Sequence, residues 1–249
     1  MIAKESHPAG SPAQQVVTDY LVAELISLGL EVNVQQAAGV QNVVARLKGA
    51  DPDGAVLFLT HYDSRNGPGA ADNSAGAAAL MEIMRAFSAG PVPRNDVIAL
   101  FDDGEELPDA FTGSKAFVRA HPWMESVRVV VGMDTAARGF ISVVDTGGPG
   151  NGWLVKALAR SYNGGIWAGF SGGGGYDTEP FKKARVRVLE LEDNYPQSEQ
   201  HTPLDVIDRV RPGTLQQLGE QGLAVGRELA GSDLRVTRAP DRTFMFFMK

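Results

Sequence analysis

Side chains that can bind metal ions gather in four short segments of this chain. They are His61, Asp63, Asp72, Glu105, Glu106, Asp134, His201 and Asp205. Cysteine is absent, so a metal ion here must be held by imidazole and carboxylate groups. Histidine together with carboxylates suits a divalent cation such as zinc. Taken alone, the first segment is also consistent with His61 and Asp63 capping a strand and Asp72 capping a helix.

Apolar runs precede these segments and predict buried strands. Ala55–Leu59 leads to His61, Val97–Phe101 leads to the paired glutamates, and Val127–Val131 leads to Asp134. A fourth run, Val186–Leu191, comes before His201. Neighbouring parallel strands bring their carboxyl ends to one edge of a sheet, where ligands bind. Carboxylates buried together without a cation are strongly disfavoured, so their convergence predicts a metal centre. Two ions that share a carboxylate are typical of aminopeptidases and phosphatases.

The remaining periodicity predicts further helices and strands around this sheet. Helices are expected at 13–28, from 73 onward, at 111–120, 151–162 and 214–229, and further strands at 31–36 and 42–47. A glycine-rich loop at 172–175 is expected to form the rim of a substrate pocket. No linker or internal repeat is evident, which predicts a single catalytic domain over residues 1–249.

Composition excludes several classes of function. The 249 residues are 43% hydrophobic and 21% charged, as in a folded globular protein, and the net charge of −7 argues against nucleic acid as a partner. The sequence contains no stretch long enough to span a bilayer and no signal peptide, so the compartment is unknown. The apolar residues 244–249 predict either a docked final strand or the point where a longer chain was cut.

The order of the motifs resembles the co-catalytic zinc aminopeptidases of the leucyl aminopeptidase and aminopeptidase Y type. The matching motifs are His61-x-Asp63, Gly69-Ala70-Ala71-Asp72-Asn73, Glu105-Glu106, Asp134 and His201-Thr202-Pro203-x-Asp205. Further motifs resemble the membrane metallopeptidases of the endoplasmic reticulum and vacuole and their bacterial relatives. These are Gly113-Ser114, His121-Pro122-Trp123, Gly150-Asn151-Gly152-Trp153-Leu154-Val155 and Asp177-Thr178.

The resemblance implies a three-layer α/β/α sandwich with a mixed, mostly parallel sheet and two Zn²⁺ ions. Asp72 would bridge the ions, with His61 and Asp134 completing one site and Glu106 and His201 completing the other. A cis peptide bond is implied after the bridging Asp72. In the relatives this domain is joined to membrane helices, which implies a membrane-associated or extracytoplasmic location and a longer parent chain.

Catalytic and supporting roles are carried over in the same way. Glu105 would be the general base, and Asp63 would orient His61. Asp205 would do the same for His201, and Asp177 is either a helix cap or a substrate contact. The run that follows Glu105 departs from the usual pattern of the family, which puts the shape of this loop in question.

The expected activity is hydrolysis of a peptide substrate, with release of its amino-terminal residue. A carboxypeptidase or dipeptidase would share the architecture and the metals. A glutaminyl cyclase would share the fold with a single zinc ion, and a non-catalytic peptidase-like ectodomain would keep the fold for binding or assembly.

Overall fold

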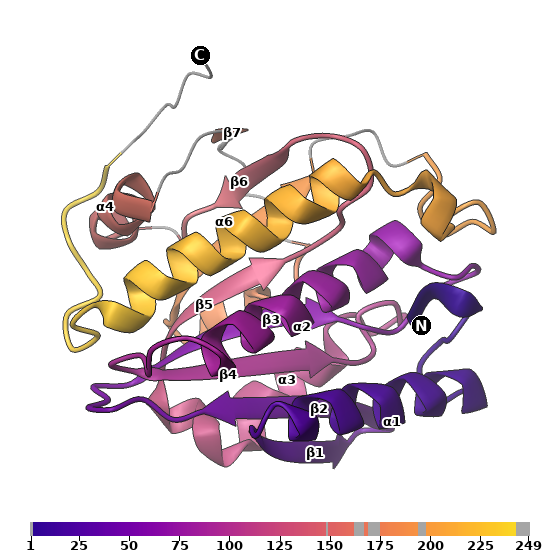
Figure 1. Ribbon diagram of the computed structural model, residues 1–249, viewed down its shortest axis with the longest axis horizontal. Helices are drawn as coiled ribbons and strands as arrows, with labels where there is room; N and C mark the ends of the chain where they lie inside the picture. Colours follow the sequence, from indigo (N-terminus) through magenta and orange to yellow (C-terminus); the bar gives the residue numbers. More distant parts are fainter. Residues whose placement is uncertain (1, 148, 162–166, 169–174, 194–197, 243–249) are drawn as a thin grey trace.

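A mixed eight-stranded sheet forms the centre of the protein (Figure 1). The computed structural model describes residues 2–147, 149–161, 167–168, 175–193 and 198–242. The strands are β1 (Glu31–Ala37), β2 (Val40–Leu47), β3 (Ala55–His61), β4 (Asp96–Asp102), β5 (Val127–Met133), β6 (Ile141–Asp145), β7 (Trp167–Ala168) and β8 (Arg187–Asp193). Their order is β1-β2-β4-β3-β5-β8-β6-β7. The inner strands β4, β3, β5 and β8 run parallel to one another.

Helices cover both faces of the sheet (Figure 1). They are α1 (Pro12–Ser27), α2 (Ala75–Ser88), α3 (Thr112–Ala120), α4 (Gly152–Ser161), α5 (Glu179–Lys183) and α6 (Pro212–Gly231). Short helical turns are η1 (Ile2–Lys4), η2 (Ala70–Ser74), η3 (Pro122–Ser126) and η4 (Ile207–Arg209). Helices α1, α2, α4 and α6 pack on one face, and α3 and α5 on the other. The predicted three-layer α/β/α fold with a mixed sheet is confirmed.

The inner strands are buried on both faces, which explains their continuous apolar sequences. Every residue of β3 and β4 is buried. Phe58 of β3 packs against α2 through Phe87, with ring centroids 6.3 Å apart. Full burial of such a side chain stabilises the fold by roughly 1.5–3 kcal/mol. The sheet is therefore a rigid platform for the residues at its strand ends.

The main elements agree with the sequence predictions, with differences at their ends. Strands β3, β5 and β8 each run two residues further than the apolar pattern indicates, so His61 is still part of β3. It pairs there with Asp102 of β4, because polar residues can continue the backbone ladder. The short elements β6, β7 and α5 were not predicted. The apolar residues 244–249 and most of the glycine-rich loop lie outside the described residues.

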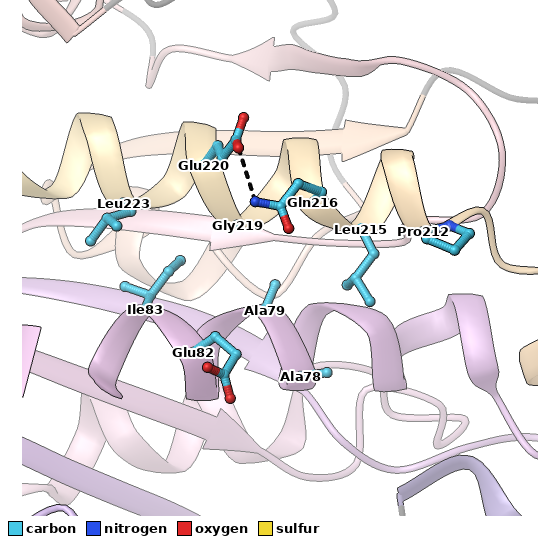
Figure 2. Close-up of a pocket in the computed structure, with 10 residues that line it drawn as sticks. All are labelled: Ala78, Ala79, Glu82, Ile83, Pro212, Leu215, Gln216, Gly219, Glu220 and Leu223. Atoms are coloured by element: carbon cyan, nitrogen blue, oxygen red, sulfur yellow. Dashed lines mark hydrogen bonds between the residues drawn. The ribbon is translucent and has the colours of Figure 1, made fainter. Parts of the chain in front are cut away.

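Helices α2 and α6 pack side by side and enclose a cavity of about 400 Å³ between them (Figure 2). Its walls are mostly apolar, with Ile83 of α2 facing Leu223 of α6, while Glu220 of α6 is held by a 2.9 Å hydrogen bond from Gln216. This cavity lies in the helical layer and contains none of the predicted metal ligands. In the part of the chain that the structure describes, no helix is long and apolar enough to cross a membrane.

Candidate active site

Three of the predicted ligands follow the carboxyl ends of neighbouring parallel strands. His61 is the last residue of β3, Asp134 directly follows β5, and Glu106 follows β4 after a short loop. Because β4, β3 and β5 are adjacent and parallel, their carboxyl ends meet at one edge of the sheet. The sheet therefore delivers an imidazole and two carboxylates to the same place.

Asp72 reaches this edge from the turn between β3 and α2. The turn, η2, begins after Gly69, whose φ of +61° is a left-handed value. A Cβ at Gly69 would lie 2.6 Å from the Asp72 carbonyl oxygen, so a side chain has no room there. The peptide bond between Asp72 and Asn73 is cis, as the resemblance implies. Asn73 Nδ2 donates to the Met133 carbonyl at 2.9 Å, which fastens the turn to the end of β5.

Two groups of ligand atoms share Asp72. His61 Nε2 lies 3.2 Å from Asp72 Oδ1 and 3.7 Å from Asp134 Oδ1. His201 Nε2 lies 3.2 Å from Asp72 Oδ2 and 3.0 Å from Glu106 Oε1. Within each group, the ligand atoms all lie within 4.8 Å of one another. The two oxygens of Asp72 thus point to different groups, as a bridging carboxylate does.

These distances fit zinc. Ligand atoms placed tetrahedrally about 2.1 Å from one ion lie roughly 3.4 Å apart, and the observed separations of 3.0–3.7 Å bracket that value. Asp72 Oδ2 and Glu106 Oε1 are buried, yet neither accepts a hydrogen bond of good geometry from a described residue. Buried carboxylate oxygens without a donor are costly, so a cation is the partner that their chemistry requires.

The electrostatics of the cluster lead to the same conclusion. Burial disfavours the charged form of His61, but hydrogen bonds to Asp134, Asp63 and Asp72 outweigh it and raise the pKa of His61 well above its usual value. Burial also opposes ionisation of Asp72, yet the imidazoles of His201 and His61, each 3.2 Å from one of its oxygens, hold its pKa below the usual range. Burial, and then repulsion from Asp72, raises the pKa of Glu106 to about 8. The centre therefore concentrates negative charge that a divalent cation would offset.

Asp63 connects one ligand group to the glutamate loop. Its Oδ1 accepts the backbone N–H of Glu105 at 3.3 Å, and its Oδ2 accepts that of Glu106 at 3.2 Å. The same carboxylate lies 3.5 Å from Nδ1 of His61, whose other ring nitrogen faces Asp72. Only 1% of Asp63 is exposed, so the loop after β4 is held by a buried carboxyl group.

Glu105 belongs to neither ligand group, although it is the neighbour of Glu106. Burial raises its pKa to about 7, and the charges of Asp134 and Asp72 act in the same direction while His61 opposes them. A carboxyl group with a pKa near neutrality can both accept and release a proton at physiological pH.

Asp205 lies elsewhere than the resemblance implies. Its Oδ1 accepts the N–H of Ala71 at 2.7 Å, and its Oδ2 accepts the N–H of Asp72 at 3.2 Å. It therefore fastens the segment that carries the bridging Asp72, and no hydrogen bond or ion pair with His201 is present among the described residues.

Asp177 is buried, with 8% of its surface exposed. It lies close to Asp102, the last residue of β4, and burial raises the pKa values of both carboxyl groups, that of Asp102 to about 8. Among the described residues, neither oxygen of Asp102 has a hydrogen-bond partner, and Asp177 Oδ1 has none either. The N-cap residue of α5 is Thr178, so Asp177 lies one residue before the cap position, and no side chain makes a cap hydrogen bond there.

A second acidic group near the centre was missed by sequence reasoning. Glu192 of β8 accepts a hydrogen bond from Tyr176 Oη at 2.6 Å, and burial raises its pKa to about 7. The N–H of Asp134 donates to the carbonyl of Leu191 at 2.9 Å, so Glu192 lies on the same side of the centre as that ligand. The signal was a pair of acids, Glu190 and Glu192, within an otherwise apolar strand.

The fold and the ligand groups are those of a metallopeptidase family. Residues 42–225 match the family described as Peptidase family M28. The chain therefore belongs to peptidase family M28.

Individual relatives are distant in sequence and close in fold. The chain is 31% identical over 217 residues to Endoplasmic reticulum metallopeptidase 1 of Mus musculus, a match that covers 78% of this chain and 23% of that protein. It is 27% identical over 237 residues to the Vacuolar membrane protease of Candida albicans, covering 86% of this chain and 27% of the relative. The LapA aminopeptidase of Legionella pneumophila superposes with a TM-score of 0.82 at 15% identity, over 93% of this chain and 69% of LapA. The chain thus spans about a quarter of the length of the curated relatives that it matches.

Proposed function

We propose that this chain is a zinc-dependent peptidase that removes amino-terminal residues from peptides and uses two zinc ions. The observation that carries the proposal is the shared Asp72, whose two oxygens belong to two separate ligand groups. His61 and Asp134 complete the first proposed zinc site, and Glu106 and His201 complete the second. Such pairs of ions are typical of aminopeptidases.

The chain's own residues have separate roles in this proposal. Zinc, when bound, polarises the scissile carbonyl and lowers the pKa of a coordinated water to about 7. Glu105 accepts the proton of the attacking water and delivers it to the leaving amine. Asp63 positions Glu105 by accepting its backbone N–H, and it holds His61 in the orientation that directs Nε2 toward the ligand group.

The presence of the complete constellation supports a catalytic role over a binding role. All five proposed ligands and Glu105 come together at one edge of the sheet. A peptidase-like ectodomain that only binds has no need of a carboxylate beside the two ligand groups that belongs to neither of them. A glutaminyl cyclase with one zinc ion does not require Asp72 in two groups.

Attachment to a membrane is part of the proposal and rests on the relatives. One of them is named a vacuolar membrane protease, and the matched region is 27% of its length. We propose that the domain functions within a longer, membrane-associated protein and faces an extracytoplasmic compartment. Fractionation of the native protein, followed by alkaline extraction of the membranes, tests this; recovery in a salt-washed soluble fraction would contradict it.

The neighbours Glu105 and Glu106 provide the test of the catalytic proposal. Glu105→Gln leaves both ligand groups intact and removes the proton acceptor, so it should retain two zinc ions and lose about two to four orders of magnitude in kcat. Glu106→Gln removes an anionic ligand and should bind fewer zinc ions. Zinc content by atomic emission and hydrolysis of leucyl-p-nitroanilide measure the two effects.

The substrate itself separates the remaining alternatives. Acetylation of the amino group of leucyl-p-nitroanilide should abolish hydrolysis by an aminopeptidase, whereas a carboxypeptidase would cleave neither compound. Near-normal activity of Glu105→Gln, or loss of zinc from Glu105→Gln but not from Glu106→Gln, would show that the assigned roles are wrong.

A further inference from the structure

A cavity of about 230 Å³ opens beside Glu106, on the side of the centre where His201 lies. Its walls come from three places in the sequence: residues 63–66 in the loop after β3, Glu106 and Leu107 after β4, and Ser6, Pro8 and Ala9 near the start of the chain. Typical ligand pockets measure about 300–1,000 Å³, so this cavity holds a single amino-acid residue better than a length of peptide.

The amino-terminal wall of the cavity is fixed by hydrogen bonds to the loop. The backbone N–H of His7 donates to Ser64 Oγ at 2.9 Å, and the N–H of Ser64 donates to the His7 carbonyl at 3.3 Å. Ser64 Oγ in turn donates to the Gly67 carbonyl at 2.9 Å. His7 is only 1% exposed and therefore does not belong to the surface. The cavity is thus built from ordered backbone on both sides.

Arg65 gives this cavity its distinctive chemistry. Its side chain is exposed and lines the cavity, and it forms no hydrogen bond or ion pair with any residue that the structure describes. Glu106 of the second ligand group lines the same cavity, so Arg65 lies beside that group. A guanidinium presents a planar set of N–H donors that matches the two oxygens of a carboxylate.

Arg65 distinguishes the two sides of the centre. Asp134 and Glu192 lie on the side of the first ligand group, where the N–H of Asp134 donates to the Leu191 carbonyl next to Glu192. On the other side Asp63 and Glu106 also line the cavity, but Asp63 accepts two backbone N–H groups and Glu106 is a proposed zinc ligand, so both carboxylates are engaged. The ammonium group of a substrate is attracted to the side of Asp134 and Glu192 and repelled by Arg65. The residue that follows the cleaved bond therefore lies toward Glu106 and Arg65.

We propose that Arg65 binds the free carboxylate of the residue after the cleaved bond, so that dipeptides are the preferred substrates. This inference rests on the proposed function and adds the substrate class. In a dipeptide, the carboxylate belongs to the leaving amino acid, which occupies the cavity. In a longer peptide, the same position is an uncharged amide, and the guanidinium has no anion to bind.

The test compares leucyl-alanine with leucyl-alaninamide, which differ only in the charge at the carboxyl end. For the wild-type protein we expect kcat/KM to be about tenfold higher for leucyl-alanine than for leucyl-alaninamide. This ratio corresponds to the low end of the free energy of a hydrogen bond to a charged group, because Arg65 is exposed to solvent. Arg65→Gln should bring this ratio close to one, and Arg65→Lys should leave an intermediate ratio. Arg227→Gln, a change on the exposed side of α6, is the matched control and should keep the wild-type ratio.

The outcomes separate this inference from the proposed function. A wild-type ratio near one, or an unchanged ratio in Arg65→Gln, overturns the role of Arg65 while leaving the peptidase assignment intact. Failure of the wild-type protein to cleave either compound overturns both. Zinc content and the unfolding midpoint of each variant are measured in parallel, and the wild-type ratio decides the question even if Arg65→Gln folds poorly.

Discussion

Replacement of Asp63 by asparagine tests how the centre is held together. The buried carboxylate accepts the N–H groups of Glu105 and Glu106 and lies 3.5 Å from Nδ1 of His61. Asparagine keeps the shape but offers one oxygen, so its NH₂ group must face one of the two backbone N–H groups. One charge-assisted hydrogen bond is lost, which costs about 1.5–3 kcal/mol.

Each factor of ten in affinity corresponds to about 1.4 kcal/mol, so this loss predicts a fall of roughly 10–100-fold in zinc affinity. A fall of this size is usual when a residue that orients a metal ligand is mutated. Competition with a chromogenic chelator measures the affinity, and kcat/KM for leucyl-p-nitroanilide should fall with it. Asp96→Asn is the matched control, because Asp96 also accepts a backbone N–H, from Gly49 at 2.9 Å, at the opposite end of β4. Unchanged zinc affinity in Asp63→Asn, or an equal loss in Asp96→Asn, would refute the reasoning.

Three further perturbations have defined outcomes. Gly67→Ala would place a Cβ 2.2 Å from the Thr202 carbonyl oxygen and displace the segment that carries His201, so zinc binding should weaken. Gly49→Ala is the control for a clash of similar size far from the ligand groups, because its Cβ would lie 2.3 Å from the Arg94 carbonyl oxygen. Burial, and then the charge of Arg46, lowers the pKa of His121 to about 4. As the pH falls below about 6.5, His121 therefore takes up a proton in the unfolded state before it does so in the folded state. The free energy of unfolding should then drop by about 1 kcal/mol more between pH 7 and 5.5 in the wild-type protein than in His121→Gln. Urea unfolding at the two pH values measures this difference. Treatment with 1,10-phenanthroline should abolish peptidase activity and lower the unfolding midpoint, and added zinc should restore both; activity that survives complete zinc removal would contradict the proposed mechanism.

The sheet could be predicted from sequence because its signal is local. Buried parallel strands such as β3 and β4 are continuous apolar runs, and the residues after them fall at the functional edge whatever the rest of the chain does. Helices α2 and α6 are long enough to show their period. The short elements β6, β7 and α5 carry too few residues to establish a pattern, and their conformation depends on the strand β8 and the helix α3 beside them.

Contacts between distant segments could not be read from the pattern. Asp205 lies 133 residues from Asp72, and nothing in either local sequence shows that its carboxylate meets the backbone of the turn before α2. Asp102 and Asp177 likewise come from separate strands and loops, and only the folded chain reveals that they share a buried position. Resemblance supplied the ligands, but the orientation of the supporting carboxylates depends on tertiary structure.

The pairing of Asp205 with the Asp72 turn also determines when the centre can form during synthesis. The first ligand group uses His61, Asp72 and Asp134, and Asn73 fastens the turn that positions Asp72 to the end of β5, but the N–H groups of Ala71 and Asp72 gain their carboxylate only when residue 205 is present. A nascent chain that has emerged just past β5 therefore has three ligands with one of the anchors of this turn still missing. Contacts of such long sequence separation form late in folding. High-affinity zinc binding should consequently mark the completion of the fold, and a partly synthesised domain would be unable to cleave its neighbours in the cell.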